Sequence, residues 1–381
     1  MKIAIVYDMI WPFNIGGTEK RNYEIAKRLV ARGHEVHLFG IKLWQGPDII
    51  KREGIIIHGV CRYKNKCNFS GRRSILETIK FGFFLMKELR KEKFDIIEAS
   101  SFPYLHLFGC KFVSRVNKTP LVFVWLQYWG DYWFDYLGKV KGFFGKIIEK
   151  QSVKLTNNHI AISKTTKEDV ERIIGKKDSV FLNYCGVDLK EIKNSSNSRE
   201  KFDILYVGRL NHQKNVKLLI NAGAILKKDF PKLRIGIIGD GPDRNQLLKL
   251  TKRNELTKNI IFKGFVKESE KVYGFMKSSK IFVLPSILEG LGIVIIEAHA
   301  CGLPTLVIDK KWNASKELIN KDGLIVRENA KELANAIKTL LKDNKLRNTM
   351  SKNGIKNARM FDWDKLTEEL EEHYGDIING N

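Results

Sequence analysis

The amino-acid sequence predicts an α/β protein made of two Rossmann-like domains. Short runs of apolar, often β-branched residues alternate with helical stretches along most of the chain. Strands that are apolar on both faces are typical of parallel sheets covered by crossover helices. The alternation occurs in both halves, and 381 residues are too many for one ordinary core. We therefore expect two parallel sheets, each flanked by helices.

The first half is expected to contain six strands and at least two long helices. The strands are predicted at Lys2–Tyr7, Glu35–Phe39, Ile55–Val60, Phe94–Ala99, Leu121–Leu126 and Asn158–Ile162. The helices are predicted at Thr18–Arg32 and Ile75–Lys91.

The second half repeats the pattern with five strands and three helices. The strands are predicted at Asp203–Val207, Leu233–Ile238, Asn259–Phe262, Ile281–Leu284 and Thr305–Ile308. The helices are predicted at Val216–Lys228, Asp243–Arg253 and Ile293–Ala300.

A polar stretch, Leu189–Ser198, separates the two halves and reads as a linker because it has no apolar periodicity. We expect an N-terminal domain over 1–189 and a C-terminal domain over 190–361. Residues 362–381 hold an acidic helix, from Trp363, that is expected to cross back to the first domain. Ligands of open α/β sheets bind at the carboxyl ends of the strands, so a central cleft between the domains is the expected site.

The chain is strongly basic, with a formal net charge of +24. This charge favours an anionic partner such as a phosphorylated substrate or an anionic membrane surface. The alternative is that most of these lysines are solvated surface residues, which would give the same net charge without an anionic partner. No nucleic-acid-binding motif accompanies the charge, so nucleic acid is not an expected partner.

The five cysteines are odd in number and lack metal-ligand spacing. Neither a signal peptide nor an apolar run of membrane-spanning length is visible. We expect reduced thiols and a cytoplasmic protein, with peripheral attachment to the inner face of the membrane as an addition.

The segment Leu284–Gly302 carries the clearest functional signal. A buried-type strand ends at a Pro-Ser turn, a loop with two glycines follows, and an apolar helix begins near Ile293. This layout aims backbone N–H groups and the positive end of a helix dipole at one point, which suits a diphosphate. Glu289 in the loop and Glu297 in the helix add acceptors for hydroxyl groups. A ligand that joins phosphates to hydroxyl-rich groups, such as a nucleotide sugar, fits this arrangement.

Basic residues follow the first strand of the second half. Gly208 ends that strand, and Arg209 and Lys214 come in the loop after it. An arginine offers a planar fork to phosphate oxygens and a lysine offers a point charge. The alternative is a pair of solvated loop residues.

Three weaker loops occupy corresponding positions. Gly241 lies in a Gly-Asp-Gly-Pro turn between a strand and a helix, and Gly17 precedes the first long helix. Phe265 follows a short strand and is placed to contact a flat base, although a core role is equally compatible. The spacing around Gly17 is not G-x-G-x-x-G, so no nicotinamide cofactor is expected.

The stretch Tyr128–Lys146 is dense in aromatic residues and then in lysines. Aromatic rings stack on sugars, and aromatic-basic surfaces also lie at membrane interfaces. Together with Phe81–Met86 it suggests a glycan or lipid-phosphate acceptor at an anionic membrane. A buried aromatic core beneath the site is the alternative.

Two further groups are not assigned to the site. Asp362 and Asp364 have D-x-D spacing, but acids at the start of a helix cap it and complement its dipole, so no metal site is expected. His299 lies near Glu297 but is expected to pack rather than bind ligand.

These motifs resemble those of glycosyltransferase family 4, the retaining enzymes of GT-B fold with an E-x7-E motif. The resemblance rests on Gly16-Gly17, Gly208-Arg209 with Lys214, Gly239–Pro242, and Glu289 with Glu297. It extends over essentially the whole chain and is more specific in the second half. It implies a metal-independent, cofactor-free hexosyltransferase-type enzyme that moves a sugar from a nucleotide-diphospho-sugar with retention of configuration.

The resemblance also implies residue roles. Arg209 and Lys214 would hold the diphosphate and stabilise the leaving group, Glu289 would bind sugar hydroxyls and Glu297 ribose hydroxyls. Catalysis is assigned to Arg209, Lys214 and Glu289. The expected donor-binding residues are Gly17, Gly208, Gly241, Phe265, Gly290, Leu291, Gly292, Ile293 and Glu297.

One position departs from the family pattern. Leu126 stands where the family usually has a histidine near the transferred sugar, and leucine donates no hydrogen bond. Gln127, Trp129 and Tyr132 are then the acceptor-side candidates. Leu126 motivates a rival hypothesis, a catalytically silent protein that binds nucleotide sugar. A nucleic-acid binder and an epimerase or phosphorylase of the same fold are further alternatives.

Overall fold

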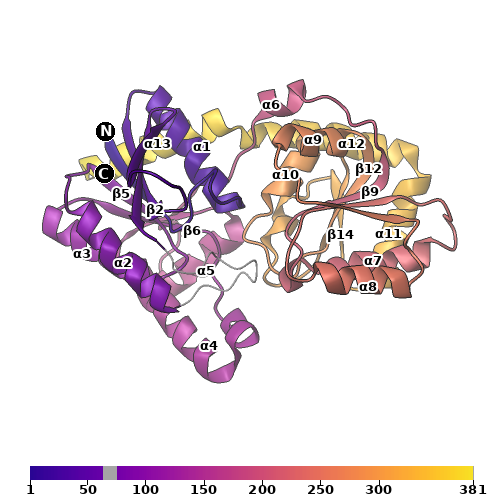
Figure 1. Cartoon of the computed structure of the whole chain (residues 1–381), viewed down its shortest axis with the longest axis horizontal. Coiled ribbons are helices and arrows are strands. Elements are labelled where there is room, and N and C mark those ends of the chain that lie inside the picture. The colour runs from indigo at the N-terminus through magenta and orange to yellow at the C-terminus, as the bar shows by residue number, and fades with distance from the viewer. Residues whose placement is uncertain (63–74, 381) are drawn as a thin grey trace. The chain divides into compact units, whose positions relative to one another are not determined.

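The computed structural model describes residues 1–62 and 75–380, which divide into two compact units (Figure 1). Unit 1 consists of Met1–Cys185 together with Trp363–Asn381, and unit 2 consists of Gly186–Asp362. Each unit has its own sheet and its own buried core. The C-terminal segment therefore belongs to the same unit as the N-terminus.

Unit 1 contains an eight-stranded sheet in the order β3-β4-β2-β1-β5-β6-β7-β8. All neighbouring strands are parallel except β3 and β4. The strands are β1 (Lys2–Val6), β2 (Glu35–Ile41), β3 (Ile49–Arg52), β4 (Ile55–Cys61), β5 (Ile96–Ser100), β6 (Leu121–Trp125), β7 (Asn158–Ala161) and β8 (Val180–Leu182).

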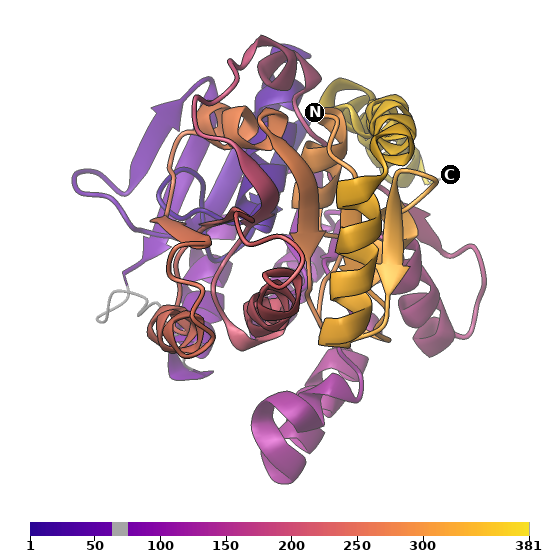
Figure 2. The same ribbon diagram turned by 90° about the vertical axis from the view of Figure 1, so that its right-hand side faces the viewer.

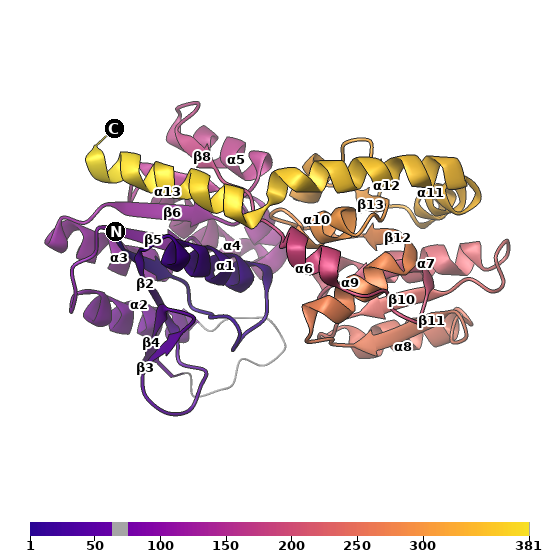
Figure 3. The same ribbon diagram turned by 90° about the horizontal axis from the view of Figure 1, so that it is seen from above.

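The helices of unit 1 cover both faces of this sheet. Right-handed crossovers place α2, α3, α4 and α5 on one face and α1 on the other. α13 packs against α1, and the two helices are seen together in Figure 3. Their bounds are α1 (Gly17–Ala31), α2 (Ile75–Leu89), α3 (Leu105–Asn117), α4 (Tyr132–Val153), α5 (Lys164–Ile174) and α13 (Trp363–Asn379).

A buried ion pair ties α13 to the centre of unit 1. The Arg21 guanidinium on α1 lies 2.9 Å from the Glu98 carboxylate on β5, and both side chains are fully buried. The Tyr374 hydroxyl on α13 donates to the other oxygen of Glu98. Removing one partner of such a pair leaves an uncompensated buried charge and typically destabilises by about 3–5 kcal/mol.

Unit 2 contains a six-stranded parallel sheet in the order β11-β10-β9-β12-β13-β14, viewed from its own side in Figure 2. The strands are β9 (Phe202–Val207), β10 (Ile235–Ile238), β11 (Ile260–Gly264), β12 (Ser279–Leu284), β13 (Thr305–Ile308) and β14 (Gly323–Val326). The central strands are almost wholly buried, which agrees with their continuous apolar sequences.

The helical segments of unit 2 complete the α/β layers. They are α6 (Leu189–Asn194), η1 (His212–Lys214), α7 (Val216–Leu226), α8 (Arg244–Arg253), α9 (Ser269–Lys277), α10 (Ile293–Ala300), η2 (Ala314–Leu318), α11 (Ala330–Lys342), α12 (Asn344–Ala358) and η3 (Arg359–Phe361).

All eleven predicted strands are confirmed within a few residues, and the described residues hold three further strands. β3 was not expected. It pairs with β4 through a two-residue turn at Glu53 and Gly54, both at positive φ, which is the hairpin geometry that such short loops favour. β8 and β14 are only three and four residues long, so they carry little periodicity.

The linker prediction for Leu189–Ser198 was wrong in its first half. Leu189–Asn194 forms α6, because the Asp188 side chain caps the helix by accepting from the Glu191 N–H at 2.8 Å. Ile192 on this helix is buried. A single apolar residue in a six-residue helix is too little for sequence periodicity to reveal.

Within the described residues, none of the helices combines the length and the apolarity needed to cross a bilayer. Cys61, Cys110, Cys185 and Cys301 are free thiols, and Cys67 lies outside the described residues.

Candidate active site

The predicted donor residues of unit 2 gather at the switch point of its sheet. β9 and β12 are neighbours, but β9 leads through α7 toward one edge and β12 leads through α10 toward the other. The carboxyl ends of two such strands form the crevice in which open α/β sheets bind ligands. The Ile287 N–H after β12 donates to the Gln213 carbonyl after β9 at 2.9 Å, so the two loops are joined directly.

An ion pair between Lys214 and Glu289 forms the centre of this arrangement. The Lys214 ammonium donates to Glu289 Oε1, and the Ser286 hydroxyl donates to the same oxygen at 2.9 Å. Glu289 and Ser286 are buried, whereas the side chain of Lys214 is 25% exposed. A cation is thus held at the mouth of the loop by a carboxylate that still has a second oxygen for a ligand.

The backbone around Glu289 is fixed on both sides. Its N–H donates to the Trp312 carbonyl and its own carbonyl accepts from the Ala314 N–H, both at 3.0 Å. The buried Asn313 amide donates to the carbonyls of Ser286 and Ile308, at 3.0 and 2.8 Å. These contacts position Glu289 before any ligand arrives.

The loop then turns into α10 at Gly292. Its φ of 86° lies in the left-handed region, and a Cβ there would come within 2.9 Å of Ser315 Cβ. The N–H groups that open the helix, around Gly290, Leu291 and Ile293, follow Glu289 directly in the chain. Such N–H groups bind anions well.

Arg209 lies in the loop after β9 and is exposed. The Tyr206 hydroxyl donates to the Arg209 carbonyl at 2.9 Å. Burial first, and then the charge of Glu289, raise the pKa of Tyr206 well above its ordinary value, so it remains a neutral donor. Tyr206 thereby fixes the backbone from which Arg209 projects.

The glycines of neighbouring strand ends allow the loops to pack closely. A Cβ on Gly239 would lie 1.9 Å from the Gly208 carbonyl oxygen, and a Cβ on Gly241 would lie 2.3 Å from the Leu210 carbonyl oxygen. The Gly239 N–H in turn donates to the Gly264 carbonyl at 2.8 Å. The close packing of these loops is therefore enough to require small residues at Gly239 and Gly241, whether or not a ligand binds there.

Glu297 and Phe265 are also at this end of unit 2. The Tyr273 hydroxyl donates to Glu297 Oε1 at 3.3 Å, and Glu297 is half-buried on α10. Phe265 follows β11 and is 55% exposed, so it is not a core residue.

His299 has a structural role, as expected. It is buried, its Nε2 lies 2.8 Å from the Thr305 hydroxyl and its Nδ1 lies 3.6 Å from the Asp322 carboxylate. Burial lowers the pKa of His299 to about 4, against the opposing effect of Asp322. It therefore joins α10 to the core as a neutral side chain.

In unit 1, Gly17 is the first residue of α1 and follows the end of β1. β1 and β5 are the switch-point strands of this sheet. The Glu19 carboxylate folds back over Gly16 and accepts from the Asn14 amide, so an acid already lies at this helix terminus. The role expected for Gly17 stays a prediction.

The acceptor-side candidates lie at the end of β6 and the start of α4. Tyr132 is buried, Gln127 and Trp129 are half-buried, and Leu126 packs against the core of unit 1. The rings of Trp129 and Tyr132 are 5.5 Å apart, in a cluster that also includes Phe102, Tyr104, Trp133 and Tyr136. The aromatic residues of this stretch thus build a core first, and they leave part of Trp129 accessible.

The sequence reasoning missed Glu149, which organises this cluster. Its carboxylate is buried and accepts four hydrogen bonds: from the Tyr104 hydroxyl at 2.6 Å, from the N–H groups of Trp129 and Gly130 at 2.8 Å, and from the Trp133 indole at 3.1 Å. Burial raises the pKa of Glu149 to about 7, although all four hydrogen bonds act to lower it. A lone glutamate between lysines in sequence gives no sign of such a role.

Possible metal ligands come together elsewhere in unit 1. Among the described residues, His37, His58 and Glu92 form such a group. The two imidazoles share a 2.8 Å hydrogen bond. The Lys2 ammonium lies 2.5 Å from Glu92, so this carboxylate already forms an ion pair. Burial lowers the pKa of His58 to about 4. Asp364 at the start of α13 pairs with Arg28 on α1 at 2.6 Å.

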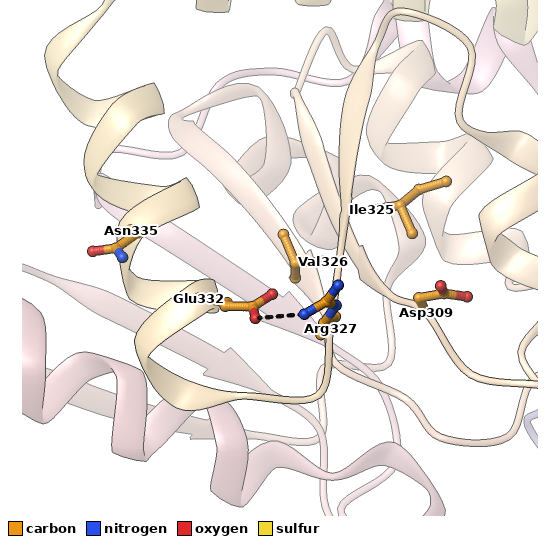
Figure 4. Close-up of a pocket in the computed structure, with 6 residues that line it drawn as sticks. All are labelled: Asp309, Ile325, Val326, Arg327, Glu332 and Asn335. Carbon is orange, nitrogen blue, oxygen red and sulfur yellow. Dashed lines mark ion pairs between the residues drawn. The ribbon is translucent and has the colours of Figure 1, made fainter.

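A surface pocket of about 540 Å³ lies at the ends of β13 and β14 (Figure 4). Its walls include the Arg327–Glu332 ion pair, 3.8 Å long, and none of the predicted site residues lines it. The lining residues are Asp309, Ile325, Val326, Arg327, Glu332 and Asn335.

The fold and these loops define the class of the protein. Two parallel α/β units, with a basic, glycine-lined switch point in unit 2, are the architecture of a GT-B glycosyltransferase. Residues 15–191 match the family model described as Glycosyltransferase Family 4, and residues 188–357 match that of Glycosyl transferases group 1. Together the two matches extend from residue 15 to residue 357. The chain therefore belongs to the family 4 glycosyltransferases, and it is an enzyme of the glycosyltransferase class.

Individual relatives agree with this assignment. The chain is 34% identical, over about half of each protein, to the N-acetylgalactosamine-N,N'-diacetylbacillosaminyl-diphospho-undecaprenol 4-alpha-N-acetylgalactosaminyltransferase of Campylobacter jejuni. It is 26% identical to the alpha-monoglucosyldiacylglycerol synthase of Acholeplasma laidlawii, over 100% of this chain and 98% of that protein. The structure of sucrose-phosphate synthase from Thermosynechococcus elongatus superposes over both full chains with a TM-score of 0.83 at 19% identity, which shows the shared fold.

Proposed function

We propose that this glycosyltransferase moves a sugar from a nucleotide-diphospho-sugar to a lipid-linked or glycan acceptor, without a metal ion and with retention of configuration. The observation that carries the proposal is the Lys214–Glu289 ion pair at the opening of α10. It puts a cation, helix N–H groups and a hydroxyl acceptor at one point of the unit 2 switch point.

The donor's diphosphate is bound by positive charge and by main-chain amides. Lys214 and Arg209 offset the charge that develops on the leaving diphosphate, and the N–H groups around Gly290 to Ile293 donate to its oxygens. No ion is needed to neutralise the phosphates if these groups supply the charge. The basic loop thus takes the role that a divalent cation plays in other phosphate sites.

The carboxylates bind hydroxyl groups. Glu289 has one oxygen occupied by Lys214 and Ser286, and its second oxygen accepts from a sugar hydroxyl. Glu297 accepts from the ribose hydroxyls. Because Glu289 is held by a lysine, it acts as a binding carboxylate rather than as the nucleophile of a double displacement.

Transfer then occurs on one face of the sugar. The bond from the anomeric carbon to the phosphate oxygen breaks, and the acceptor hydroxyl oxygen bonds to the same face. The acceptor proton passes to the leaving phosphate oxygen. The protein supplies orientation and charge stabilisation, and configuration is retained.

The reactions of two relatives favour a lipid-linked acceptor. The Campylobacter enzyme acts on a diphospho-undecaprenol carrier and the Acholeplasma enzyme makes a glucosyldiacylglycerol. The aromatic residues near Trp129 suit a sugar or a lipid-phosphate head group.

The test is turnover of a panel of nucleotide sugars with polyprenyl-diphosphate sugars and diacylglycerol as acceptors. Release of nucleoside diphosphate that depends on the acceptor is expected, and NMR of the product should show the donor's anomeric configuration. Activity should persist in excess EDTA. An inverted product or a strict need for a divalent ion contradicts the mechanism, and donor binding without any turnover favours the silent nucleotide-sugar binder.

A further inference from the structure

In the second part of α4 a stripe of apolar side chains is exposed, whereas an ordinary surface helix turns such a stripe toward the core. The backbone leaves the helical region at Gly138, with φ 76° and ψ 179°, so the helix after it runs as a separate segment. Its inner side carries Gly142, Gly145 and Glu149. A Cβ at Gly142 would lie 2.6 Å from the Trp133 carbonyl oxygen, and one at Gly145 would lie 2.5 Å from the Trp133 ring. This side is pressed onto Trp133 and has room for small residues only.

The outer side of the same segment is apolar. Val140, Phe143, Phe144 and Ile147 are exposed by 73%, 53%, 59% and 40%. Their spacing of three, four and seven residues makes one stripe, which in a soluble helix would face the core. The remaining positions of the segment are the partly buried Ile148 and four lysines, Lys139, Lys141, Lys146 and Lys150.

Neighbouring helices also carry exposed apolar residues. α3 contacts both α2 and α4, and the three helices cover the same face of the unit 1 sheet (Figure 1). α2 and α3 pack backbone to backbone, since a Cβ on Gly109 would lie 3.0 Å from the Gly82 carbonyl oxygen. Phe83 on α2 and Phe112 on α3 remain about half exposed.

The concentration of exposed apolar residues here is unusual. Twelve of the twenty-two large apolar side chains that are exposed in the described part of the chain lie on α2, α3 and α4. They are Ile75, Leu76, Ile79, Phe83, Phe84, Phe108, Phe112, Val116, Val140, Phe143, Phe144 and Ile147. Single exposed apolar residues need no explanation, whereas a gathering on adjacent helices marks an interaction surface.

The charges on these helices select the partner. Eight basic residues stand on α2, α3 and α4 against the acids Glu77, Glu88, Asp135 and the buried Glu149. The basic residues are Lys80, Lys87, Lys111, Arg115, Lys139, Lys141, Lys146 and Lys150. Apolar rings between lysines suit an interface of acyl chains and anionic head groups, in which lysine stems lie along the apolar layer and their ammonium groups reach the phosphates.

We propose that this surface, with the α4 segment Lys139–Lys150 at its centre, docks unit 1 onto an anionic lipid bilayer. The rings of Phe143 and Phe144 enter the head-group region, to a depth of about 5–10 Å for interfacial helices of this kind. The inference rests on the proposed function in one respect: a lipid-linked acceptor would lie in the bilayer onto which unit 1 docks. Lipid binding itself needs no turnover, so the two proposals are tested separately.

The test is vesicle flotation of the full chain. Wild type should float with vesicles that contain phosphatidylglycerol, float poorly with pure phosphatidylcholine, and be released by high salt. The variant Val140→Ser/Phe143→Ser/Phe144→Ser should lose about ten-fold or more in partitioning. The matched control Ile225→Ser/Leu248→Ser, which removes exposed apolar residues from unit 2, should float like wild type.

A second pair of measurements separates docking from folding and from function. The triple variant should keep the wild-type urea midpoint and the thermal shift with nucleotide sugar, because the replaced side chains are exposed and lie in the other unit. Wild type that fails to float at low salt overturns the proposal. So does wild type that self-associates in light scattering while the triple variant is monomeric, since the surface would then be covered by a second copy.

Discussion

Two buried glutamates, one in each unit, have different kinds of hydrogen-bond partner. Glu289 in unit 2 faces the Lys214 ammonium and the Ser286 hydroxyl. Glu149 in unit 1 accepts from two backbone amides, a phenol and an indole, all of them neutral. An opposite charge stabilises an ionised carboxylate directly, whereas neutral donors have to offset the full effect of burial. Glu149 accordingly has its pKa raised to about 7.

This difference in partners determines which carboxylate is available to a ligand. Glu289 has a spare oxygen at a switch-point crevice, and its cation is partly exposed. Both oxygens of Glu149 are used inside unit 1, where they hold the Trp129–Gly130 loop against α4. Glu289 is thus built to bind substrate and Glu149 to position a loop.

The largest expected effect is on the unit 2 side of this comparison. Lys214→Ala removes the cation at the leaving group and should lower kcat/KM by about 10²–10³-fold. Steady-state release of nucleoside diphosphate measures it. Lys217→Ala, an exposed lysine on α7, is the matched control and should leave turnover unchanged. Equal kinetics in the two variants would remove Lys214 from the site.

The second effect concerns Glu149 and the pH dependence of stability. Its pKa of about 7 in the folded state lies above the ordinary 4.5, so the folded chain keeps a proton that the unfolded chain releases between these values. Stability should therefore fall as pH rises through this window. Between pH about 5 and about 8 the wild type should lose roughly 2–3 kcal/mol relative to Glu149→Gln.

Urea unfolding at the two pH values measures this change. Asp135→Asn, which replaces an exposed carboxyl on the same helix, is the control. A wild-type minus Glu149→Gln difference that stays constant, or grows with pH, would mean that Glu149 is ionised throughout. The neutral donors would then be sufficient to compensate for burial.

The third effect is on donor recognition. Glu297→Ala removes the expected acceptor for the ribose hydroxyls and should lower kcat/KM for the donor by about ten-fold, or 1.4 kcal/mol, mainly through KM. Initial rates at varied donor concentration give the two constants. Glu270→Ala on α9, which is exposed, should behave like wild type. An unchanged donor KM would give Glu297 a structural role, with Tyr273 as one partner, in place of ribose binding.

The smallest effect tests how Glu289 is positioned. Ser286→Ala removes one neutral hydrogen bond to Glu289 and should reduce kcat/KM a few-fold, about 0.5–1.5 kcal/mol. Ser278→Ala removes a comparable hydrogen bond, to the Ser198 carbonyl, away from Glu289. The control should lose stability without a change in donor KM. If the two variants have the same kinetics, the Ser286 hydroxyl does not contribute to the positioning of Glu289.

Much of unit 2 was predictable because its signals are local. A buried apolar strand, a Pro-Ser turn and Gly292 at the start of α10 all lie within some twenty residues, and turn chemistry and burial act over that range. The partners of these residues were not predictable in the same way. Ser286 and Tyr273 carry hydroxyls like many others, and only the packing of α9 and of the β12 loop brings them to Glu289 and Glu297.

Unit 1 was harder because its sequence is ambiguous. The same aromatic residues fit a sugar platform, a membrane surface or a core, and in the structure Tyr132 and Trp133 are core while Phe143 and Phe144 are exposed. Helical spacing alone gives the stripe but not its direction. The direction follows from Gly142, which lies against the Trp133 backbone, and from Gly145, which lies against the Trp133 ring.

By itself the sequence determined that the chain forms two α/β halves and that Gly208, Arg209, Lys214 and Glu289 follow the ends of strands. It did so because strand periodicity and loop chemistry depend on neighbours along the chain. Tertiary structure alone decided that Lys214 meets Glu289 across 75 residues and that Glu149 is enclosed by neutral donors. Such pairs depend on which strands are adjacent in a sheet and which helix faces pack, and these are settled only when the whole core is assembled.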